Sequence, residues 1–429
     1  MRILIKKIIN QNNDIITNII SRLITLFGSL TVASLVSFKL DPSMQGAFYS
    51  FMSIAGITSI FELGFNNIIV QYISHNRKDL VYVNSFLKLV RNYNIYTVII
   101  LFVTLNLIGF YFFNDSQYLY YSWVLFTLSS SCYFIFLSRI GVLEGLNKTI
   151  LASRYRLLYS SINLISIILL LSNTNFNLWC LGISQLVALV FCIKIFKLNI
   201  DKQHHELSYF KEIWPLQKKY IITWISGYFI INAIVPITYT YSPLYAGKIG
   251  LSLSIVGSIS AIIMAGFNTR IPLLCNTLAE GNILKYNNTF KKFSFIAISF
   301  SILSGVLLYV FLCLGIFDKL GIINQSSLVP LGDFTYLILF IILQVIVYLL
   351  STYLRNFKKE PFAIHAFITA VTMIVLLLYS LNDGIVSNLG RLIFINTFFI
   401  SLPIAILIFN KFKKIYVKEI INNNSNTGE

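Results

Sequence analysis

The chain has 429 residues, of which 57% are hydrophobic and only 11% are charged, and its mean hydropathy is +0.77. A soluble domain carries about a quarter charged residues, so this composition excludes an ordinary water-soluble fold. The formal net charge of +17 would suit a nucleic-acid partner, but the basic residues are spread over many short loops, which argues against one.

Apolar stretches of membrane-spanning length account for nearly the whole chain. The hydrocarbon core of a bilayer is about 30 Å thick and needs about 20 apolar residues per helix. Windows of this kind are predicted at 18–38, 45–66, 94–113, 120–143, 155–173, 177–197, 218–239, 249–271, 293–315, 334–355, 362–381 and 390–410. The predicted fold class is therefore an all-α membrane protein with 12 transmembrane helices.

The basic residues fall on alternate loops. If the N-terminus is cytoplasmic, the cytoplasmic loops, tails and adjoining helix ends hold all 33 Lys and Arg residues except Lys39, Lys248, Lys319 and Arg391. Such a bias over short loops is the positive-inside pattern. It predicts that both termini are cytoplasmic.

A charge-rich stretch divides the predicted helices into two groups of six. We predict an N-terminal lobe at 1–197, a cytoplasmic linker at 198–217, a C-terminal lobe at 218–412 and a cytoplasmic tail at 413–429. Each lobe has an even number of helices, so a repeat would be parallel, with its axis along the membrane normal. Two such lobes predict a central cavity that opens alternately to either side, as in transporters.

A short sequence repeat indicates the same duplication. The second predicted helix ends with Gly64-Phe65-Asn66, and the eighth ends with Gly266-Phe267-Asn268. In the loops that follow, residues 84–88 read NSFLK and residues 288–292 read NTFKK. Both pairs occupy the same topological position in the two lobes.

Charged side chains within the predicted spans are the first candidates for function. A charge at the centre of a membrane helix costs roughly 2.5 to 3.5 kcal/mol unless it finds a partner or water. Arg22 lies about one turn inside the first span, where it would either bind an anionic ligand or snorkel to the cytoplasmic surface. Glu62, Arg139 and Glu144 lie near the cytoplasmic ends of their spans, and Arg270 closes the eighth span.

These two acids and two bases predict a cytoplasmic gate, in which Glu62 of one lobe pairs with Arg270 of the other. The alternative is that each group reaches lipid headgroups or partners in its own lobe, which we favour for Arg139 and Glu144. A glutamate inside the membrane would also be able to take up a proton and couple transport to a proton gradient.

A basic and aromatic cluster is predicted on the outer side, where the seventh span meets the eighth. Tyr241, Tyr245 and Lys248 follow one another closely there. A lysine supplies a point charge for pyrophosphate, and aromatic faces would stack on sugar rings. The alternative is an interfacial belt of aromatic residues.

No arrangement of catalytic residues stands out. His75, His204, His205 and His365 are predicted in cytoplasmic loops or at helix ends, without the spacing of metal ligands. Phosphate-binding and dinucleotide-binding fingerprints are absent. The sequence therefore predicts a protein that is not an enzyme, with no catalytic site, no metal and no cofactor, driven by an ion gradient or by substrate flux.

Several motifs resemble those of Wzx-type O-antigen flippases, within the superfamily of multidrug, oligosaccharidyl-lipid and polysaccharide exporters. The resemblance covers the full chain in length and topology. The matching stretches are FELGFN at 61–66, VQYISH at 70–75, AGKIGLS at 246–252, IP at 271–272, AEGN at 279–282 and, for the superfamily, EGLNK at 144–148.

The resemblance implies a MATE-like fold and a flippase of the bacterial inner membrane. Its substrate would be an undecaprenyl-pyrophosphate-linked oligosaccharide, the repeat unit of an O-antigen or capsule, moved from the cytoplasmic to the periplasmic leaflet. In that family, basic cavity residues hold the pyrophosphate, and the positions that correspond here are Arg22 and Lys248. The implied partners are this lipid-linked substrate, membrane lipids and the polysaccharide polymerase machinery.

Two other functions stay open at this point. A cation-coupled multidrug exporter of the same fold would need an acid in its cavity, and Glu62 is the candidate, since Asp14 and Asp41 flank the first span rather than lie within it. A membrane glycan polymerase would resemble its class in having a large periplasmic loop with arginines. The longest predicted outer loop, 315–333, has one lysine and no arginine.

Overall fold

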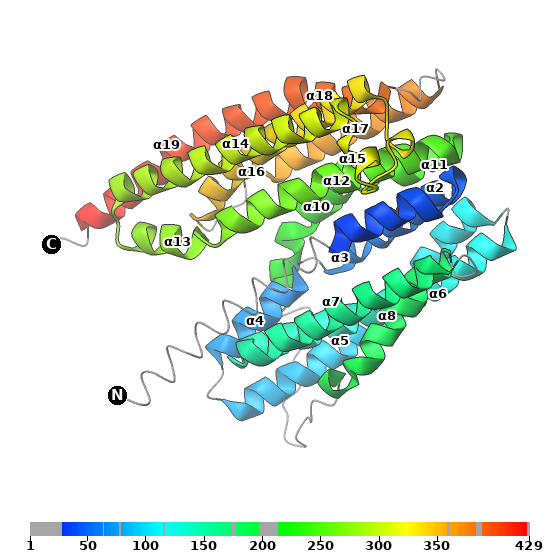
Figure 1. Cartoon of the computed structure of the whole chain (residues 1–429). Coiled ribbons are helices and arrows are strands. Elements are labelled where there is room, and N and C mark those ends of the chain that lie inside the picture. Colours follow the sequence, from blue (N-terminus) through cyan, green and yellow to red (C-terminus); the bar gives the residue numbers. More distant parts are fainter. Residues whose placement is uncertain are drawn as a thin grey trace, which may run out of the picture. The chain divides into compact units, whose positions relative to one another are not determined.

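The structure is a computed structural model of the chain. It describes residues 28–62, 64–76, 79–114, 116–173, 177–196, 213–357, 361–382 and 388–426. Within these ranges the regular secondary structure is helical throughout, with no strand (Figure 1). This confirms the all-α class that the apolar windows predict.

The chain divides into two compact units, Met1–Trp224 and Ile225–Glu429. The boundary between them falls within α10 (Trp214–Ile231). Most of the predicted linker at 198–217 lies outside the described residues. The predicted limits of the two lobes and of the tail therefore stay predictions.

The first unit begins, within the described residues, with a helical stretch at 28–39. The helices that follow are α2 (Pro42–Ala55), α3 (Thr58–Glu62), α4 (Phe65–His75), α5 (Leu80–Phe113), α6 (Gln117–Gly145), α7 (Thr149–Ser172), α8 (Trp179–Phe191) and the 3-10 turn η2 (Ile193–Phe196). The start of α5 is fixed by Asp79, whose carboxylate accepts a hydrogen bond from the Tyr82 amide at 3.0 Å, as expected of an N-cap.

Aromatic rings fill the core between α2, α5 and α6. Phe51 lies with its ring centroid 4.7 Å from that of Phe113 and 5.0 Å from that of Trp123. The Trp123 indole donates a hydrogen bond to the Leu105 carbonyl at 2.9 Å. A Cβ atom at Gly109 would overlap this indole, so the absence of a side chain there lets α6 pack closely on α5.

The second unit contains α11 (Ile234–Tyr241), α12 (Pro243–Asn268), α13 (Ile271–Ala279), α14 (Ile283–Cys313), α15 (Ile316–Lys319), η3 (Gln325–Ser327), α16 (Leu331–Arg355), α17 (Ala363–Asn382), α18 (Leu389–Asn396), the π-helical turn η5 (Thr397–Ser401) and α19 (Leu402–Asn426). Tyr286, Phe290 and Tyr353 pack at the centre of its main apolar cluster. The Tyr286 hydroxyl donates to the Tyr353 carbonyl at 3.0 Å, so the polar end of this buried ring is paired.

Eight helices of the described chain are long and apolar enough to cross a membrane, or up to nine if a bent pair counts as one span. These eight are Leu80–Phe113, Gln117–Gly145, Thr149–Ser172, Pro243–Asn268, Ile283–Cys313, Leu331–Arg355, Ala363–Asn382 and Leu389–Tyr416. The protein is thus a multi-pass membrane protein. Twelve spans and cytoplasmic termini stay predictions.

The difference from twelve arises where the predicted spans are interrupted. The predicted span 45–66 is divided among α2, α3 and the start of α4. The predicted span 218–239 is bent by 43° between Ile221–Ile231 and Ile234–Tyr241. The apolar helix at 179–191 is shorter than a full span, and the first predicted span begins outside the described residues.

The long helices α5 and α14 expose large apolar side chains. Leu107 and Tyr111 of α5 are 68% and 76% exposed, and Phe295 of α14 is 74% exposed. Large exposed apolar side chains along such long helices indicate a membrane-facing side in a protein of this composition. These helices therefore supply lipid contact in addition to packing.

Candidate substrate and gate sites

The FELGFN motif lies at a break in the helix. α3 ends at Glu62 and α4 starts at Phe65. Between them Gly64 has φ of 72°, a left-handed conformation that glycine adopts without a steric penalty. The Phe61 carbonyl at this break accepts a hydrogen bond from the Tyr93 hydroxyl at 3.1 Å.

Glu62 is held at the end of this broken helix. Its side chain is partly buried, and the Asn66 side chain lies within hydrogen-bonding reach of its carboxylate. No ion pair joins Glu62 to any residue that the structure describes. Tyr93 secures the break further, because its hydroxyl also accepts a hydrogen bond from Gln217 Nε2 at 3.2 Å.

The other two predicted gate residues of the first unit are placed differently. Glu144 forms an ion pair with Arg156 at 2.7 Å, with side chains that are 28% and 40% exposed. Arg139 is buried in α6, with 6% of the residue exposed. Its Nε and Nη1 atoms have no hydrogen-bond partner among the described residues.

Arg270 lies in the second unit at the short break between α12 and α13. It is exposed, and its guanidinium lies 5.1 Å from the ring centroid of Phe293, a cation–π distance. The same break is tied to α16, because the Tyr348 hydroxyl donates to Asn268 Oδ1 at 2.5 Å. Glu62 and Arg270 belong to different units, so their pairing stays a prediction.

The predicted outer cluster lies where two helices meet, because Tyr241 ends α11 whereas Tyr245 and Lys248 lie on α12. Ser242 caps α12, with its hydroxyl accepting from the Tyr245 amide at 3.3 Å, and Pro243 occupies the first turn. The helix thus starts before the predicted position 249. Lys248 lies one turn after Tyr245 on the same face of α12.

Lys248 is half-buried and has no hydrogen bond or ion pair with any described residue. The two predicted tyrosines are engaged. Tyr241 donates to Asn382 Oδ1 at 2.9 Å, and the buried Tyr245 donates to Asp333 Oδ2 at 2.9 Å. Lys248 is therefore the polar member of this cluster that has no partner among the described residues.

Asp333, which sequence reasoning did not select, is the partner that organises this region. Its Oδ2 also accepts from the Gly390 amide at 3.0 Å, and its Oδ1 accepts from the Arg391 amide at 2.8 Å. These are first-turn amides of α18, which has no cap from its own Asn388. A carboxylate on free amides at a helix N-terminus is stabilising. The sequence feature that could have indicated Asp333 is an acidic residue at the start of an apolar run.

His365 is buried near the start of α17, whereas the sequence marked it only as a residue of a loop or helix end. Its Nε2 lies 2.9 Å from Ser401 Oγ and 3.0 Å from the Ser401 carbonyl. Ser401 belongs to the π-helical turn η5. This contact satisfies the histidine within the second unit, and no group of His, Cys, Asp and Glu suited to a metal occurs among the described residues.

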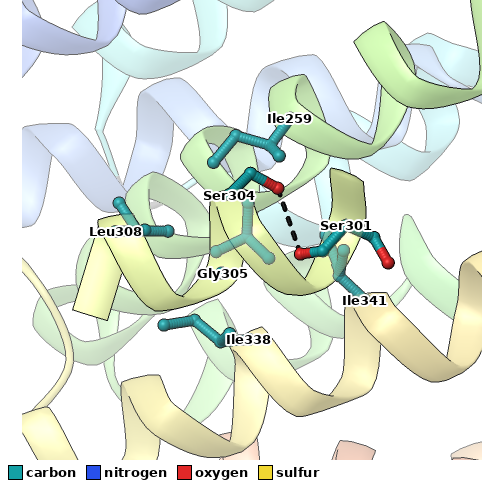
Figure 2. Close-up of a pocket in the computed structure, with 8 residues that line it drawn as sticks. Ile259, Ser301, Ser304, Gly305, Leu308, Ile338 and Ile341 are labelled. Carbon is teal, nitrogen blue, oxygen red and sulfur yellow. Dashed lines mark hydrogen bonds between the residues drawn. The ribbon is translucent and has the colours of Figure 1, made fainter. Parts of the chain in front are cut away.

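A small hollow between α12, α14 and α16 is shown in Figure 2. It encloses about 220 Å³ including its open mouth and is lined mainly by aliphatic side chains, such as Ile259 and Ile338. The hydroxyls of Ser301 and Ser304 donate to carbonyls of their own helix. The residues that line the hollow therefore include no charged group.

The structure brings together only part of the predicted site. Tyr245 and Lys248 share one helix face in the second unit, whereas Glu62 belongs to the first. Arg22 lies outside the described residues. The predicted substrate-binding and gating roles therefore stay predictions.

Comparison with known proteins identifies the fold. No protein-family model and no curated protein matches the sequence. Among solved structures, an inward-facing multidrug resistance MATE family transporter of the MOP superfamily superposes with a TM-score of 0.67 at 12% identity, covering 93% of this chain and 99% of that one.

Two further structures extend the comparison. The MATE multidrug transporter DinF-BH, solved as a complex with a ligand, has a TM-score of 0.63 at 11% identity, covering 94% of this chain and 95% of that one. The lipid II flippase MurJ, in an inward closed conformation, has a TM-score of 0.60 at 15% identity, covering 95% of this chain and 91% of that one.

All three are transporters or flippases by name rather than enzymes. Identities this low establish the fold and leave the substrate open. The chain is a multi-pass membrane protein with the fold that MATE family transporters of the MOP superfamily and the lipid II flippase MurJ share.

Proposed function

We propose that the protein is a flippase for an undecaprenyl-pyrophosphate-linked oligosaccharide, the repeat unit of an O-antigen or capsule. It moves this substrate from the cytoplasmic to the periplasmic leaflet of the bacterial inner membrane by alternating access, coupled to an ion gradient. The Wzx-like motifs support this proposal. So does the fold, since a lipid II flippase shares it.

The observation that carries the proposal is Lys248. This side chain is half-buried on an apolar helix, yet it makes no hydrogen bond or ion pair within the described residues. A charge held in a membrane helix without a partner is typical of a ligand site. An ammonium suits a phosphate as a point charge, whereas a cationic drug would be repelled by it.

We assign the gate to Glu62 and Arg270. Glu144 already has Arg156 as a partner in its own unit, and Arg139 is buried. Glu62 lies at a glycine break, and Arg270 lies at the break that follows α12. Helices change direction at breaks of this kind, and we propose that closing of the gate pairs these two charges and that opening separates them.

The second candidate function is cation-coupled multidrug export. It is supported by the two multidrug transporters of the same fold and by Glu62, a carboxylate without a basic partner among the described residues. This function requires the acid and not the lysine. Substitution of Lys248 and Glu62 therefore separates the two candidates.

The test is complementation of a deletion strain of the native host. Loss of surface polysaccharide, with accumulation of lipid-linked single repeat units, is expected in the deletion strain and should be restored by the wild type and by Lys248→Arg. Lys248→Ala should fail. Lys319→Ala, which removes an exposed lysine, is the matched control and should complement fully.

Normal polysaccharide in the deletion strain would exclude the flippase role. In that case drug resistance should be measured on expression of the wild type, Glu62→Gln and Lys248→Ala. Resistance lost with Glu62→Gln and kept with Lys248→Ala would establish the exporter. Protein levels in the membrane must be equal for all variants compared.

A further inference from the structure

The first unit contains a buried arginine that the proposed transport site does not use. Arg139 lies in α6 with 6% of its surface exposed, and its Nε and Nη1 atoms are buried without a partner among the described residues. Isolated burial of an ionised group is strongly unfavourable. Since guanidinium stays protonated in proteins, an acceptor at these two nitrogen atoms would stabilise the charge.

The register of α5 and α6 places a second arginine at the same level along the two helices. Hydrogen bonds from Ser138 Oγ to Asn94 Oδ1, at 3.0 Å, and from Asn106 Nδ2 to Thr127 Oγ1, at 3.1 Å, fix these helices antiparallel and in register. Arg91 precedes Asn94 by about one turn, so it lies level with the turn of α6 that holds Arg139. Arg91 therefore adds a second positive charge at this level of the two helices.

Most of the polar atoms left unpaired near this level, within the described chain, are donors, and the exception is Asn66 Oδ1, which lies against Gly141 of α6. Ser138 Oγ lies 3.0 Å from Asn94 Oδ1 and 3.2 Å from the Phe134 carbonyl, and Asn94 Nδ2 is buried without a described partner. Arg139 supplies two more such donors. No ion pair joins Arg91 or Arg139 to a carboxylate within the described ranges. Unpaired donors and positive charge without a carboxylate partner favour an anion.

We propose that Arg139, Arg91 and Asn94 form a phosphate-binding site in the first unit, occupied by the phosphate of an anionic membrane lipid. Arg139 lies roughly 9 Å before the end of α6, which is the predicted cytoplasmic end. Arginine forks match phosphate oxygens in pairs. At this depth a lipid headgroup reaches the site from the cytoplasmic leaflet, and the site is independent of the proposed substrate.

The experiment compares lipid binding by the purified full-length protein and its variants in a zwitterionic detergent. Native mass spectrometry and thermal melting are recorded with added phosphatidylglycerol, phosphatidylcholine or inorganic pyrophosphate. We expect phosphatidylglycerol to bind the wild type and raise its melting temperature. Arg139→Met should weaken this binding by about tenfold or more, as expected for loss of a charged hydrogen bond.

Two further variants keep the test decisive. Arg91→Gln changes an exposed residue, so it should fold even if Arg139→Met does not, and it should weaken binding to a smaller extent. Arg154→Met is the matched control, because it removes an exposed arginine of the same unit and should leave binding unchanged.

Equal binding of phosphatidylglycerol by the wild type, Arg139→Met and Arg91→Gln would overturn the site. So would the absence of any effect of lipid or pyrophosphate on the wild type. If pyrophosphate stabilised the wild type but not Arg139→Met, and phosphatidylglycerol stabilised neither, the bound phosphate would not come from a lipid. None of these outcomes depends on polysaccharide transport.

Discussion

The two units differ in how the charge of a buried side chain is hydrogen-bonded. Arg139 in the first unit and Asp333 in the second are each only 6% exposed. Asp333 accepts hydrogen bonds from Tyr245, Gly390 and Arg391, whereas Arg139 has two unpaired nitrogen atoms within the described residues. A fully hydrogen-bonded buried charge holds helices together, while an unpaired one lowers stability until a ligand arrives.

The largest effect is expected from Asp333→Ala. Three donors from α12 and α18 would lose their acceptor in a buried place, so the free energy of unfolding should fall by about 3 to 5 kcal/mol. Denaturant unfolding of the purified protein measures this. Asp41→Ala is the control, because Asp41 is exposed and its side chain caps nothing. Equal losses for both variants would contradict the role of Asp333.

A second, smaller loss is expected from Gly390→Ala. A Cβ atom at this position would overlap the backbone oxygen of Asp333 and approach its carboxylate within 2.8 Å. Either α18 or α16 must move, and we expect a loss of about 2 to 3 kcal/mol, as for other overpacked sites.

Gly332→Ala provides the control for this prediction. A Cβ atom at Gly332 would have no neighbouring atom within 4 Å, and Gly332 lies beside Asp333 in the same helix. It should be neutral in the same unfolding measurement. A neutral Gly390→Ala would show that the packing of α18 on α16 is looser than the structure has it.

Arg139→Met should raise the free energy of unfolding, whereas the two preceding substitutions should lower it. In detergent without anionic lipid, methionine keeps much of the apolar volume and removes the unpaired charge, so the free energy of unfolding should rise by about 1 to 2 kcal/mol. Phosphatidylglycerol should remove this advantage by stabilising only the wild type. A variant that is less stable than the wild type under lipid-free conditions would assign Arg139 a structural role.

Composition and periodic apolar windows were enough to predict the class of this fold, because a membrane span is a property of about 20 consecutive residues. The predicted spans at 94–113 and 120–143 fall inside α5 and α6. Interruptions were not predictable in the same way. Gly64-Phe65-Asn66 and Gly266-Phe267-Asn268 share their sequence, yet Gly64 has φ of 72° and Gly266 lies within the helix α12.

Tertiary contacts decide between these two outcomes. In the first unit, the carbonyl released by the break is taken by Tyr93, which lies on another helix. Asp333 and its partners on α18 are likewise far apart in sequence. Such pairings depend on which helices pack together, and one sequence carries no local signal for that. The same holds for the contact of His365 with Ser401.

The smallest effect is expected from Glu144→Gln. This acid pairs with Arg156 at 2.7 Å, but both side chains are partly exposed, at 28% and 40%. Exposed ion pairs contribute about 0 to 1 kcal/mol, so the free energy of unfolding should fall by less than about 1 kcal/mol, and the loss should shrink further in high salt. A double-mutant cycle with Arg156→Gln isolates the pair. A coupling energy much larger than this would show that Glu144, like Asp333 in the other unit, stabilises the packing of its helices. Arg139 would then be the one of these two charged residues of the first unit that lowers stability.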